Sequence, residues 1–281
     1  MNVRICVVTF RSAESATRLL EFLRVQYPSW ELCLWDNYSE ESCRLRAAVE
    51  DRRLADHAIW SSSNVGFARG VNGLAAIRGN WEFLLLVNPD VVLVEDVRDL
   101  FQLFEYPRTA VVGARATAPD GVVSRTEFRD LGPFGLAVRS VCGERQRPKS
   151  LVSENHTVDG WLEGSLLAIS RHAWEDVGAF DERFFLYSEE QDWQRRARRC
   201  GWHVRQLPRV VYSHEGRGSA RGEVGLIAKS VEWEELSRRR YIRKWWGPFG
   251  VAIYVACVGV GSAAKRLLGK GPYRASGKPS P

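Results

Sequence analysis

The chain has 281 residues, of which 45% are hydrophobic and 26% are charged, with 24 glycines and 11 prolines. This length and apolar content allow one large core or two small ones, which excludes a disordered protein, a collagen-like repeat and a small disulfide scaffold. The formal net charge of +6 is unevenly distributed, because all 34 acidic residues precede Leu236 whereas ten of the 40 basic residues follow it. A mildly acidic body with a basic tail indicates that one end of the protein meets an anionic surface.

The six cysteines form neither a C-x-x-C pair nor a zinc-ligand spacing, so we expect reduced, mostly buried thiols. The N-terminal residues run directly into a strand-like stretch, without the basic region, apolar run and cleavage site of a secretory signal. We therefore expect a cytoplasmic protein.

The first hundred residues alternate between strand and helix patterns. The predicted strands are Val3–Phe10, Glu31–Trp35, His57–Trp60 and Phe83–Val87. The predicted helices between them are Ser12–Gln26, Glu40–Arg53 and Phe67–Gly79. This β-α-β order is typical of a parallel sheet, in which the apolar run Phe83–Val87 suits a central strand.

The middle of the chain is predicted to be irregular. Residues 119–157 are polar apart from an apolar piece at Phe134–Val141, so we expect loops or a mobile insertion there. Further strands are predicted at Leu166–Ile169, Val204–Leu207 and Val210–Tyr212. Further helices are predicted at Arg171–Val177 and Glu189–Cys200, the second closed by Gly201.

The tail carries an uncharged stretch from Trp245 to Ala264, which Gly247-Pro248 interrupts near its start. About 16 apolar residues remain after the break, whereas a membrane-spanning helix needs roughly 20. The tryptophan pair and basic flanks favour a helix at the lipid headgroup boundary, with a packed helix and a true span as the alternatives.

Polar clusters follow three of the predicted strands, at Thr9-Phe10, Asp36-Asn37-Tyr38-Ser39 and Asn88-Pro89-Asp90. Because ligands of open parallel sheets bind beyond the carboxyl ends of the strands, these clusters predict a binding site. Asp36 has two interpretations. It either hydrogen-bonds the base or ribose of a nucleotide, or it is a turn residue after the strand. Asp90, directly after a buried strand, is placed to hold Mg²⁺ or Mn²⁺ against a diphosphate, unless it only completes a Pro-Asp turn.

Other residues offer weaker signals. The turn Asn64-Val65-Gly66-Phe67 before a helix would present backbone N–H groups to a phosphate, while Asn72 in that helix is either a ligand contact or a packed amide. His214 is a candidate metal ligand or a structural histidine. The helix that follows Ser188 begins with three acidic residues, Glu189, Glu190 and Asp192. They either cap the helix, where its dipole favours negative charge, or repel one another so that one carboxyl group has the raised pKa of a general base.

Taken together, these motifs resemble family 2 glycosyltransferases, especially their rhamnosyltransferase-like branch. The resemblance covers about residues 3–220 and includes, in order, Asp36-Asn37-x-Ser39, Asn64-x-Gly66-Phe67-Ala68, Asn88-Pro89-Asp90 and the run from Gly178 to Asp192. It implies an α/β protein of the GT-A fold, with a mixed, mostly parallel sheet flanked by helices and a basic C-terminal helical tail. It also implies a nucleotide-diphosphate sugar donor and inversion of the anomeric centre.

The resemblance assigns roles by position. The nucleotide-sugar site would be lined by Thr9, Phe10, Asp36, Asn64, Gly66, Phe67, Asn72 and Asn88. The sugar and acceptor pocket would be bordered by Trp161, Glu163 and Gly164, and the metal, Mg²⁺ or Mn²⁺, would be held by Asp90 and His214. Among the acids Glu189, Glu190 and Asp192, Glu190 takes the position of the expected base, where the family has Asp, and Glu189 remains the alternative. Arg11 also departs from the family, since many relatives have Asn there.

These inferences predict a glycosyltransferase domain over 1–235, with a nucleotide-sugar-binding half at 1–118 and an acceptor and catalytic half at 158–220, and a basic, apolar tail over 236–281. The expected reaction is transfer of a hexose to a glycan or to a lipid-diphosphate-linked acceptor, with dTDP-rhamnose as the expected donor. The expected process is synthesis of cell-wall or other cell-surface polysaccharides. The expected location is peripheral, at the inner face of the cell membrane.

Two other function classes compete with this one. An inactive relative would act only as a membrane- or glycan-binding module. A nucleotidyltransferase would need a Gly-rich, Lys-containing phosphate loop, which Val7–Ser15 lacks. No nucleic-acid partner is expected, because the basic charges lie outside the body and no recognisable RNA- or DNA-binding motif accompanies them.

Overall fold

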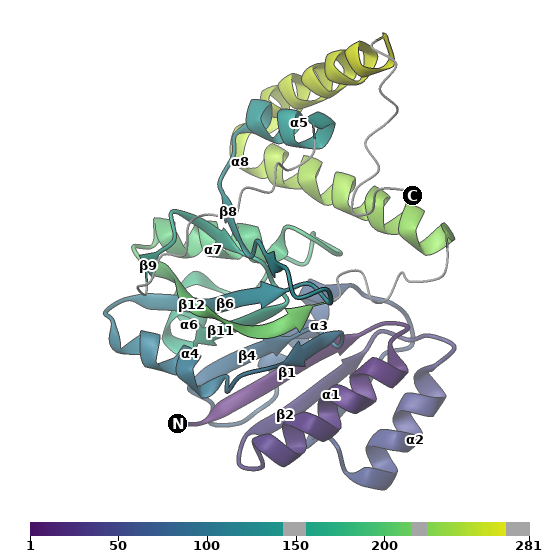
Figure 1. Ribbon diagram of the computed structural model, residues 1–281, viewed down its shortest axis with the longest axis vertical. Helices are drawn as coiled ribbons and strands as arrows, with labels where there is room; N and C mark the ends of the chain where they lie inside the picture. Colours follow the sequence, from purple (N-terminus) through teal and green to yellow (C-terminus); the bar gives the residue numbers. More distant parts are fainter. Residues whose placement is uncertain (143–155, 215–223, 268–281) are drawn as a thin grey trace. The chain divides into compact units, whose positions relative to one another are not determined.

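The computed structural model describes residues 1–142, 156–214 and 224–267 (Figure 1). The chain divides into two compact units. The first unit comprises Met1–Arg129 and Pro148–Ser237, and the second comprises Asp130–Arg147 and Arg238–Pro281. The site described below lies entirely in the first unit.

A large mixed sheet forms the centre of the first unit. Its spatial order is β3-β2-β1-β4-β11-β6-β12-β5. The bounds of these strands are β1 (Val3–Thr9), β2 (Glu31–Asp36), β3 (His57–Trp60), β4 (Phe83–Val87), β5 (Val91–Leu93), β6 (Thr109–Thr117), β11 (Leu166–Ser170) and β12 (His203–His214). Strands β3, β2, β1 and β4 are parallel, as predicted, and β12 is parallel to β6, whereas β11 and β5 run antiparallel to their neighbours.

Helices cover both faces of this sheet. They are α1 (Ala13–Gln26), α2 (Ser42–Arg52), α3 (Phe67–Ala75), α4 (Arg98–Gln102), α6 (Arg171–Val177) and α7 (Glu189–Arg199). Alternate residues of β1 belong to two separate cores: Ile5 and Val7 pack with α1, whereas Cys6 and Val8 pack with α3 and α7. Because side chains alternate across a strand, a sheet covered on both faces requires apolar residues on both faces of β1, as Ile5 to Val8 provide.

Several elements were not anticipated from the sequence. No strand was predicted at β5 or β6, and the two separate strands predicted over residues 204–212 form the single strand β12, with an irregular register between Leu207 and Val210. The remaining short elements are η1 (Leu103–Glu105), β7 (Val123–Ser124), β8 (Glu127–Arg129), β9 (His156–Thr157) and β10 (Gly160–Leu162). Strands β8 and β10 pair with each other in a small second sheet. Part of the predicted irregular stretch, residues 143–155, lies outside the described residues.

A buried arginine anchors the C-terminal end of α3 to β1. The side chain of Arg4 is fully buried, donates to the carbonyl oxygens of Leu74 (3.1 Å) and Ile77 (2.7 Å), and pairs with the carboxylate of Glu31 (2.7 Å). A cation is favourable at this end of a helix because the last carbonyl groups lack partners in the helix itself. Arg4 therefore helps to hold α3, whose opposite end faces the site.

The described part of the second unit contains α5 (Pro133–Cys142), which is the apolar piece noted in the sequence, and the C-terminal part of α8 (Val224–Leu267). The backbone of α8 is not helical at Gly247 (φ 67°, ψ −169°), next to Pro248, where the sequence predicts a break. By length and composition alone, the stretch Leu226–Leu267 is the one described helix long and apolar enough to cross a membrane.

The cysteines are less buried than expected. Cys6 and Cys33 are buried in the sheet, but Cys43, Cys142 and Cys200 are exposed. The prediction of mostly buried thiols is therefore wrong, because these three residues lie at or next to the ends of helices rather than in the core.

Candidate active site

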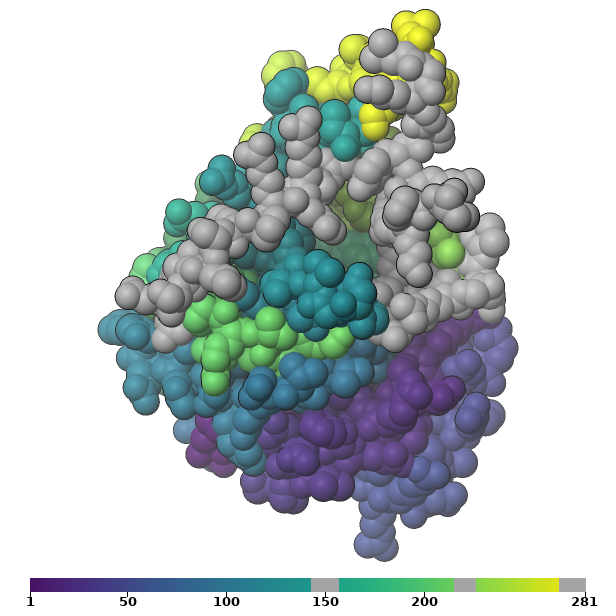
Figure 2. All heavy atoms as spheres, viewed as in Figure 1, coloured from purple at the N-terminus to yellow at the C-terminus, as the bar shows by residue number. Residues whose placement is uncertain are grey.

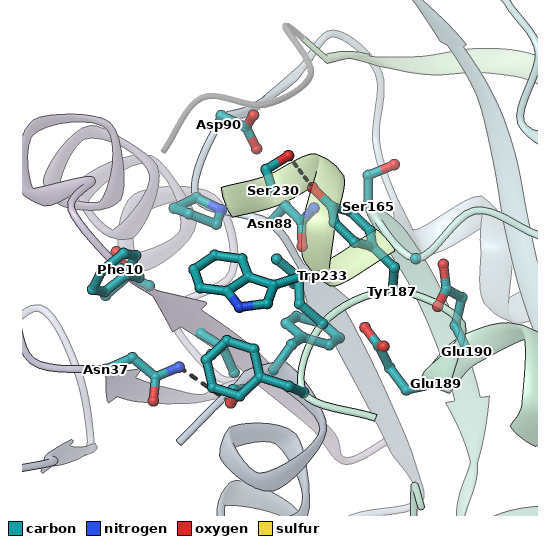
Figure 3. Close-up of a pocket in the computed structure, with 18 of the residues that line it drawn as sticks. Phe10, Asn37, Asn88, Asp90, Ser165, Tyr187, Glu189, Glu190, Ser230 and Trp233 are labelled. Atoms are coloured by element: carbon teal, nitrogen blue, oxygen red, sulfur yellow. Dashed lines mark hydrogen bonds between the residues drawn. The ribbon is translucent and has the colours of Figure 1, made fainter. Parts of the chain in front are cut away.

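A cavity of about 410 Å³ opens beyond the carboxyl ends of β1 and β4 (Figure 3). It gathers most of the residues that the sequence singles out: Thr9, Phe10, Asn64, Gly66, Phe67, Asn88, Asp90, Glu163, Gly164, Glu189, Glu190 and His214. These residues are up to about 200 positions apart in the chain. They meet because the parallel strands β1 and β4 end at the same edge of the sheet, which is where open α/β sheets bind ligands.

Two predicted nucleotide contacts do not line this cavity. Asp36 is buried and accepts a hydrogen bond from the hydroxyl of Ser42, and burial raises the pKa of its carboxyl group. Asn72 bridges α3 to the backbone of Phe180, donating to its carbonyl (2.9 Å) and accepting from its amide (3.0 Å). In the structure both side chains form hydrogen bonds within the protein, which connect β2 to α2 and α3 to the segment around Phe180. Their contacts with a nucleotide stay predictions.

Two other candidate site residues, Asp192 and Trp161, also have their contacts outside the cavity. Asp192 is completely buried and forms an ion pair with Arg196 (3.0 Å) one turn later in α7. Trp161 stacks on Phe128 with ring centroids 4.6 Å apart, and its indole N–H is buried with no hydrogen-bond acceptor among the described residues. Neither residue is part of the cavity wall.

The start of α3 forms one wall of the cavity, and its geometry requires glycine at position 66. Gly66 has φ +90°, and a Cβ there would lie 2.3 Å from the carbonyl oxygen of Phe185. The amide of Phe67 donates to that same carbonyl (2.8 Å), and the side-chain amide of Asn37 donates to the carbonyl of Gly66 (3.2 Å). This network fixes the N-terminus of α3 at the cavity, where the helix dipole favours an anion.

Three polar atoms of the cavity residues are buried without a described hydrogen-bond partner: Thr9 Oγ1, Glu189 Oε2 and Glu190 Oε2. A buried polar atom that lacks a partner costs roughly 1–3 kcal/mol, so native proteins keep few of them. A polar ligand bound in the cavity would supply partners for such atoms.

The carboxyl groups of Glu189 and Glu190 both have raised pKa values. Burial is the main cause in each case, and the two groups interact with each other. The pKa of Glu190 rises to about 7 through burial and the negative charge of Glu163, even though backbone amides, including that of Gly164, stabilise the charged form. The pKa of Glu189 lies well above its ordinary value of 4.5. Glu190 is thus the one of the pair poised to exchange a proton near neutral pH.

Asp90 and His214 form a second charged group in the cavity. The imidazole Nε2 lies 3.2 Å from Asp90 Oδ1, and Nδ1 lies 3.6 Å from Glu163 Oε1. Burial alone would lower the pKa of His214, but its contacts with the two carboxylates outweigh burial and raise that pKa to about 10. Within the described ranges, no cluster of three or more His, Cys, Asp or Glu side chains is placed to hold a metal by itself.

The Asp90–His214 pair fits a divalent cation in part. One carboxylate and one neutral imidazole are suitable ligands for Mn²⁺, and the carboxylate suits Mg²⁺. A cation held by both residues would displace the proton that His214 otherwise carries beside the two carboxylates. They leave most of the coordination positions open, so the remaining ligands would have to come from a bound diphosphate and water.

The sequence analysis missed the wall formed by the first part of α8. Leu226, Ser230 and Trp233 line the cavity and share one helix face, because they are four and three residues apart. The hydroxyl of Ser230 lies 3.2 Å from that of Tyr187 (Figure 3). Trp233 lies against Phe185, with ring centroids 5.0 Å apart. Helical spacing was the only signal for this wall, and it does not distinguish a ligand contact from core packing.

These contacts brace the segment that presents the acid pair. Tyr187 and Ser188, directly before α7, have φ values of 69° and 70°, which non-glycine residues rarely adopt. Ser237, later in α8, donates to the carbonyl of Leu186 (2.7 Å). The first part of α8 therefore supports both the cavity wall and the strained turn before Glu189.

A second hollow, of about 500 Å³, shares Phe10, Asn64 and Trp233 with the first. Arg11, the residue that departs from the family pattern, lines this second hollow and pairs with the carboxylate of Glu40 (2.6 Å).

Comparison with known proteins shows related sequences but no matching protein-family model. The chain is 29% identical over 210 residues to an N-acetylglucosaminyl-diphospho-decaprenol L-rhamnosyltransferase of Mycobacterium tuberculosis, covering 66% of this chain and 67% of that protein. It is 21% identical over 262 residues to the rhamnosyltransferase WbbL of Escherichia coli, covering 86% of this chain and 93% of that protein.

Solved structures share the fold. The mannosyltransferase PcManGT from Pyrobaculum calidifontis, in complex with GDP-Man and Mn²⁺, superposes with a TM-score of 0.52 at 15% identity, covering 95% of this chain and 78% of that one. S. aureus TarS 1–349 in complex with UDP-GlcNAc gives a TM-score of 0.55 at 15% identity, covering 96% and 84%. The resemblance seen in the motifs is thereby confirmed: the chain has the GT-A fold of these glycosyltransferase structures and is similar in sequence to rhamnosyltransferases.

Proposed function

We propose that this enzyme transfers a hexose, rhamnose from dTDP-rhamnose in our assignment, to a hydroxyl of a glycan or lipid-diphosphate-linked glycan, with inversion at the anomeric carbon. The observation that carries the proposal is the single cavity that holds a buried acid pair, an Asp-His pair and a helix N-terminus. The names of the related proteins support the choice of sugar and of a diphosphate-linked acceptor.

The donor would bind along the ends of β1 and β4. Thr9, Phe10, Asn64 and Asn88 line this side of the cavity, and the positive end of the α3 helix dipole would face the phosphates of the donor. Asp90 and His214 would hold Mg²⁺ or Mn²⁺, and the cation supplies positive charge that offsets the charge on the diphosphate leaving group.

Glu190 acts as the general base in this proposal. Its carboxylate takes the proton of the acceptor hydroxyl while that oxygen attacks C1 of the donor sugar from the face opposite the nucleoside diphosphate. The bond between C1 and the diphosphate oxygen breaks, so one displacement inverts the configuration. Glu189, whose pKa is also raised by burial and by the charge of Glu190, lies beside the base.

The basic tail, residues 236–281, is proposed to bind the anionic inner face of the cell membrane, where a lipid-linked acceptor is located. Support comes from its ten basic residues and from the apolar helix that ends at Leu267. The binding-only alternative is not favoured, since the acid pair and the Asp-His pair face the same cavity.

The test is donor selectivity followed by product analysis. UDP-, GDP- and dTDP-sugars are screened for thermal stabilisation with and without Mn²⁺ or Mg²⁺, because a ligand that binds only the folded state raises its apparent stability. We expect dTDP-rhamnose with a divalent cation to give the largest shift, and transfer to a diphosphate-linked glycan to give a product of inverted anomeric configuration. A retained configuration would refute direct displacement, and no shift with any nucleotide sugar would refute the proposed donor class.

A further inference from the structure

The second unit exposes large apolar side chains on two helices that are far apart in the sequence. On α5, Phe134 and Val138 are 66% and 46% exposed and lie one turn apart. On α8, Phe249, Val260 and Leu267 are 77%, 72% and 89% exposed. Their spacings of 11 and 7 residues place these three on one face of the helix. Soluble proteins rarely leave several large apolar groups exposed in one small unit without a partner.

The two helices pack against each other, as the ribbon and space-filling views also show (Figure 1, Figure 2). The hydroxyls of Ser140 in α5 and Tyr254 in α8 are 2.9 Å apart, and the ammonium of Lys265 donates to the carbonyl of Val141. A Cβ at Gly261 would lie 2.9 Å from the side chain of Val141, so the glycine allows close approach. These contacts use residues of α5 other than Phe134 and Val138, which stay exposed.

The described part of this unit is strongly basic. Asp130 is its one acid, and it accepts a hydrogen bond from Tyr241 (3.2 Å). The basic residues are on α5 and at both ends of the uncharged stretch of α8: Arg139, Arg238, Arg239, Arg240, Arg243, Lys244, Lys265 and Arg266. An anionic bilayer complements this charge, whereas a second copy of the unit would repel it.

We propose that α5 and the C-terminal part of α8 form one membrane-binding unit, in which Phe134 and Val138 enter the headgroup region of an anionic bilayer together with the exposed face of α8. This inference rests on the proposed membrane association of the tail and extends it to a helix from the middle of the chain. The membrane contact is therefore built from two separate segments, Asp130–Cys142 and Arg238–Leu267.

The test is flotation of the full-length protein with vesicles of 70% phosphatidylcholine and 30% phosphatidylglycerol, and with pure phosphatidylcholine. The variant Phe134→Ser/Val138→Ser removes the apolar pair on α5. The matched control, Phe22→Ser/Val25→Ser, removes an exposed Phe/Val pair from α1 in the first unit. Because both pairs are exposed, both variants are expected to fold, and their melting temperatures verify this.

We expect binding of the wild type to the anionic vesicles only, a fall of about tenfold or more for the α5 variant, and no change for the control. Wild-type binding that the α5 variant retains in full would overturn the role of α5 while leaving the tail proposal intact. A wild type that floats with neither vesicle would overturn the membrane association itself. A vesicle-free dimer that the α5 variant abolishes would also overturn the inference, in favour of self-association.

Discussion

The raised pKa of Glu190 predicts how the reaction depends on pH. A general base must be ionised, and burial together with the charge of Glu163 moves the pKa of Glu190 from 4.5 to about 7. The transfer rate should therefore rise with pH up to about 7 and then level off. An ordinary glutamate would be almost fully ionised at pH 6, and it would give a flat profile across this range.

The size of the effect follows from the titration. Below a pKa of about 7, the ionised fraction and hence the rate fall by about tenfold per pH unit. Glu190→Gln should lower kcat by about 10²–10⁴-fold at pH 8 with donor affinity nearly unchanged, since loss of a general base commonly has that effect. Glu189→Gln should be much milder, because it leaves the carboxylate of the proposed base in place.

The same shift affects stability with a definite sign. Between pH 4.5 and about 7 the folded state keeps a proton that the unfolded state loses, so the Glu190 carboxyl group lowers the free energy of unfolding as pH rises through this range. Relative to wild type, Glu190→Gln should therefore gain stability from pH 4 to pH 8, on the order of 2–3 kcal/mol.

The assay is single-turnover transfer at saturating donor from pH 5 to pH 9, for the wild type and the variants Glu163→Gln, Glu189→Gln and Glu190→Gln. Glu163→Gln removes a negative charge that raises the pKa of Glu190, so the pH below which the transfer rate falls should be lower in this variant. A flat wild-type profile between pH 5 and pH 8 would refute the raised pKa. A larger loss of activity in Glu189→Gln than in Glu190→Gln would assign the base to Glu189.

Four further predictions follow from the structure. Asp90→Asn should weaken cation-dependent donor binding by at least tenfold in calorimetry while the melting temperature stays unchanged, and unaltered binding would remove Asp90 from the metal site. Gly66→Ala should reduce donor affinity and stability together, because its Cβ would collide with the Phe185 carbonyl at φ +90°; a normal donor titration would contradict this geometry. Arg4→Met should lower the free energy of unfolding by about 3 kcal/mol in urea titrations, because the Glu31 carboxylate and the carbonyl groups at the end of α3 lose their partner. A decrease below about 1 kcal/mol would show that Arg4 is not needed to hold α3. Truncation after Ser237 should abolish vesicle flotation yet preserve donor-induced thermal stabilisation, because every cavity residue is kept; loss of that stabilisation would show that the first unit depends on the second.

Local patterns in the sequence were sufficient to predict much of the fold and part of the candidate site. Apolar runs bounded by turns predicted β1 to β4, and helical spacing predicted α1, α2 and α7, since each element depends on residues close in the chain. Polar residues after β1 and β4 were assigned to one site because parallel strands end at a common edge. Thr9, Asn88 and Asp90 do line one cavity.

Other features depend on contacts between distant residues, and these only the tertiary structure decided. The side-chain amide of Asn72 donates to the carbonyl of Phe180, 108 positions later in the chain, and residue type alone does not reveal that partner. Trp233 faces the cavity through the packing of α8 on the segment before α7.

The sequence by itself determined the fold class, the alternation of strands and helices along the parallel half of the sheet and the acids available for catalysis, because periodicity and turn chemistry are local properties. The burial of Glu190, the effect of the Glu163 charge on its pKa and the packing of α5 on α8 were decided by tertiary structure alone. Burial and charge interactions depend on distances in space, and the spacing of residues along the chain does not specify those distances.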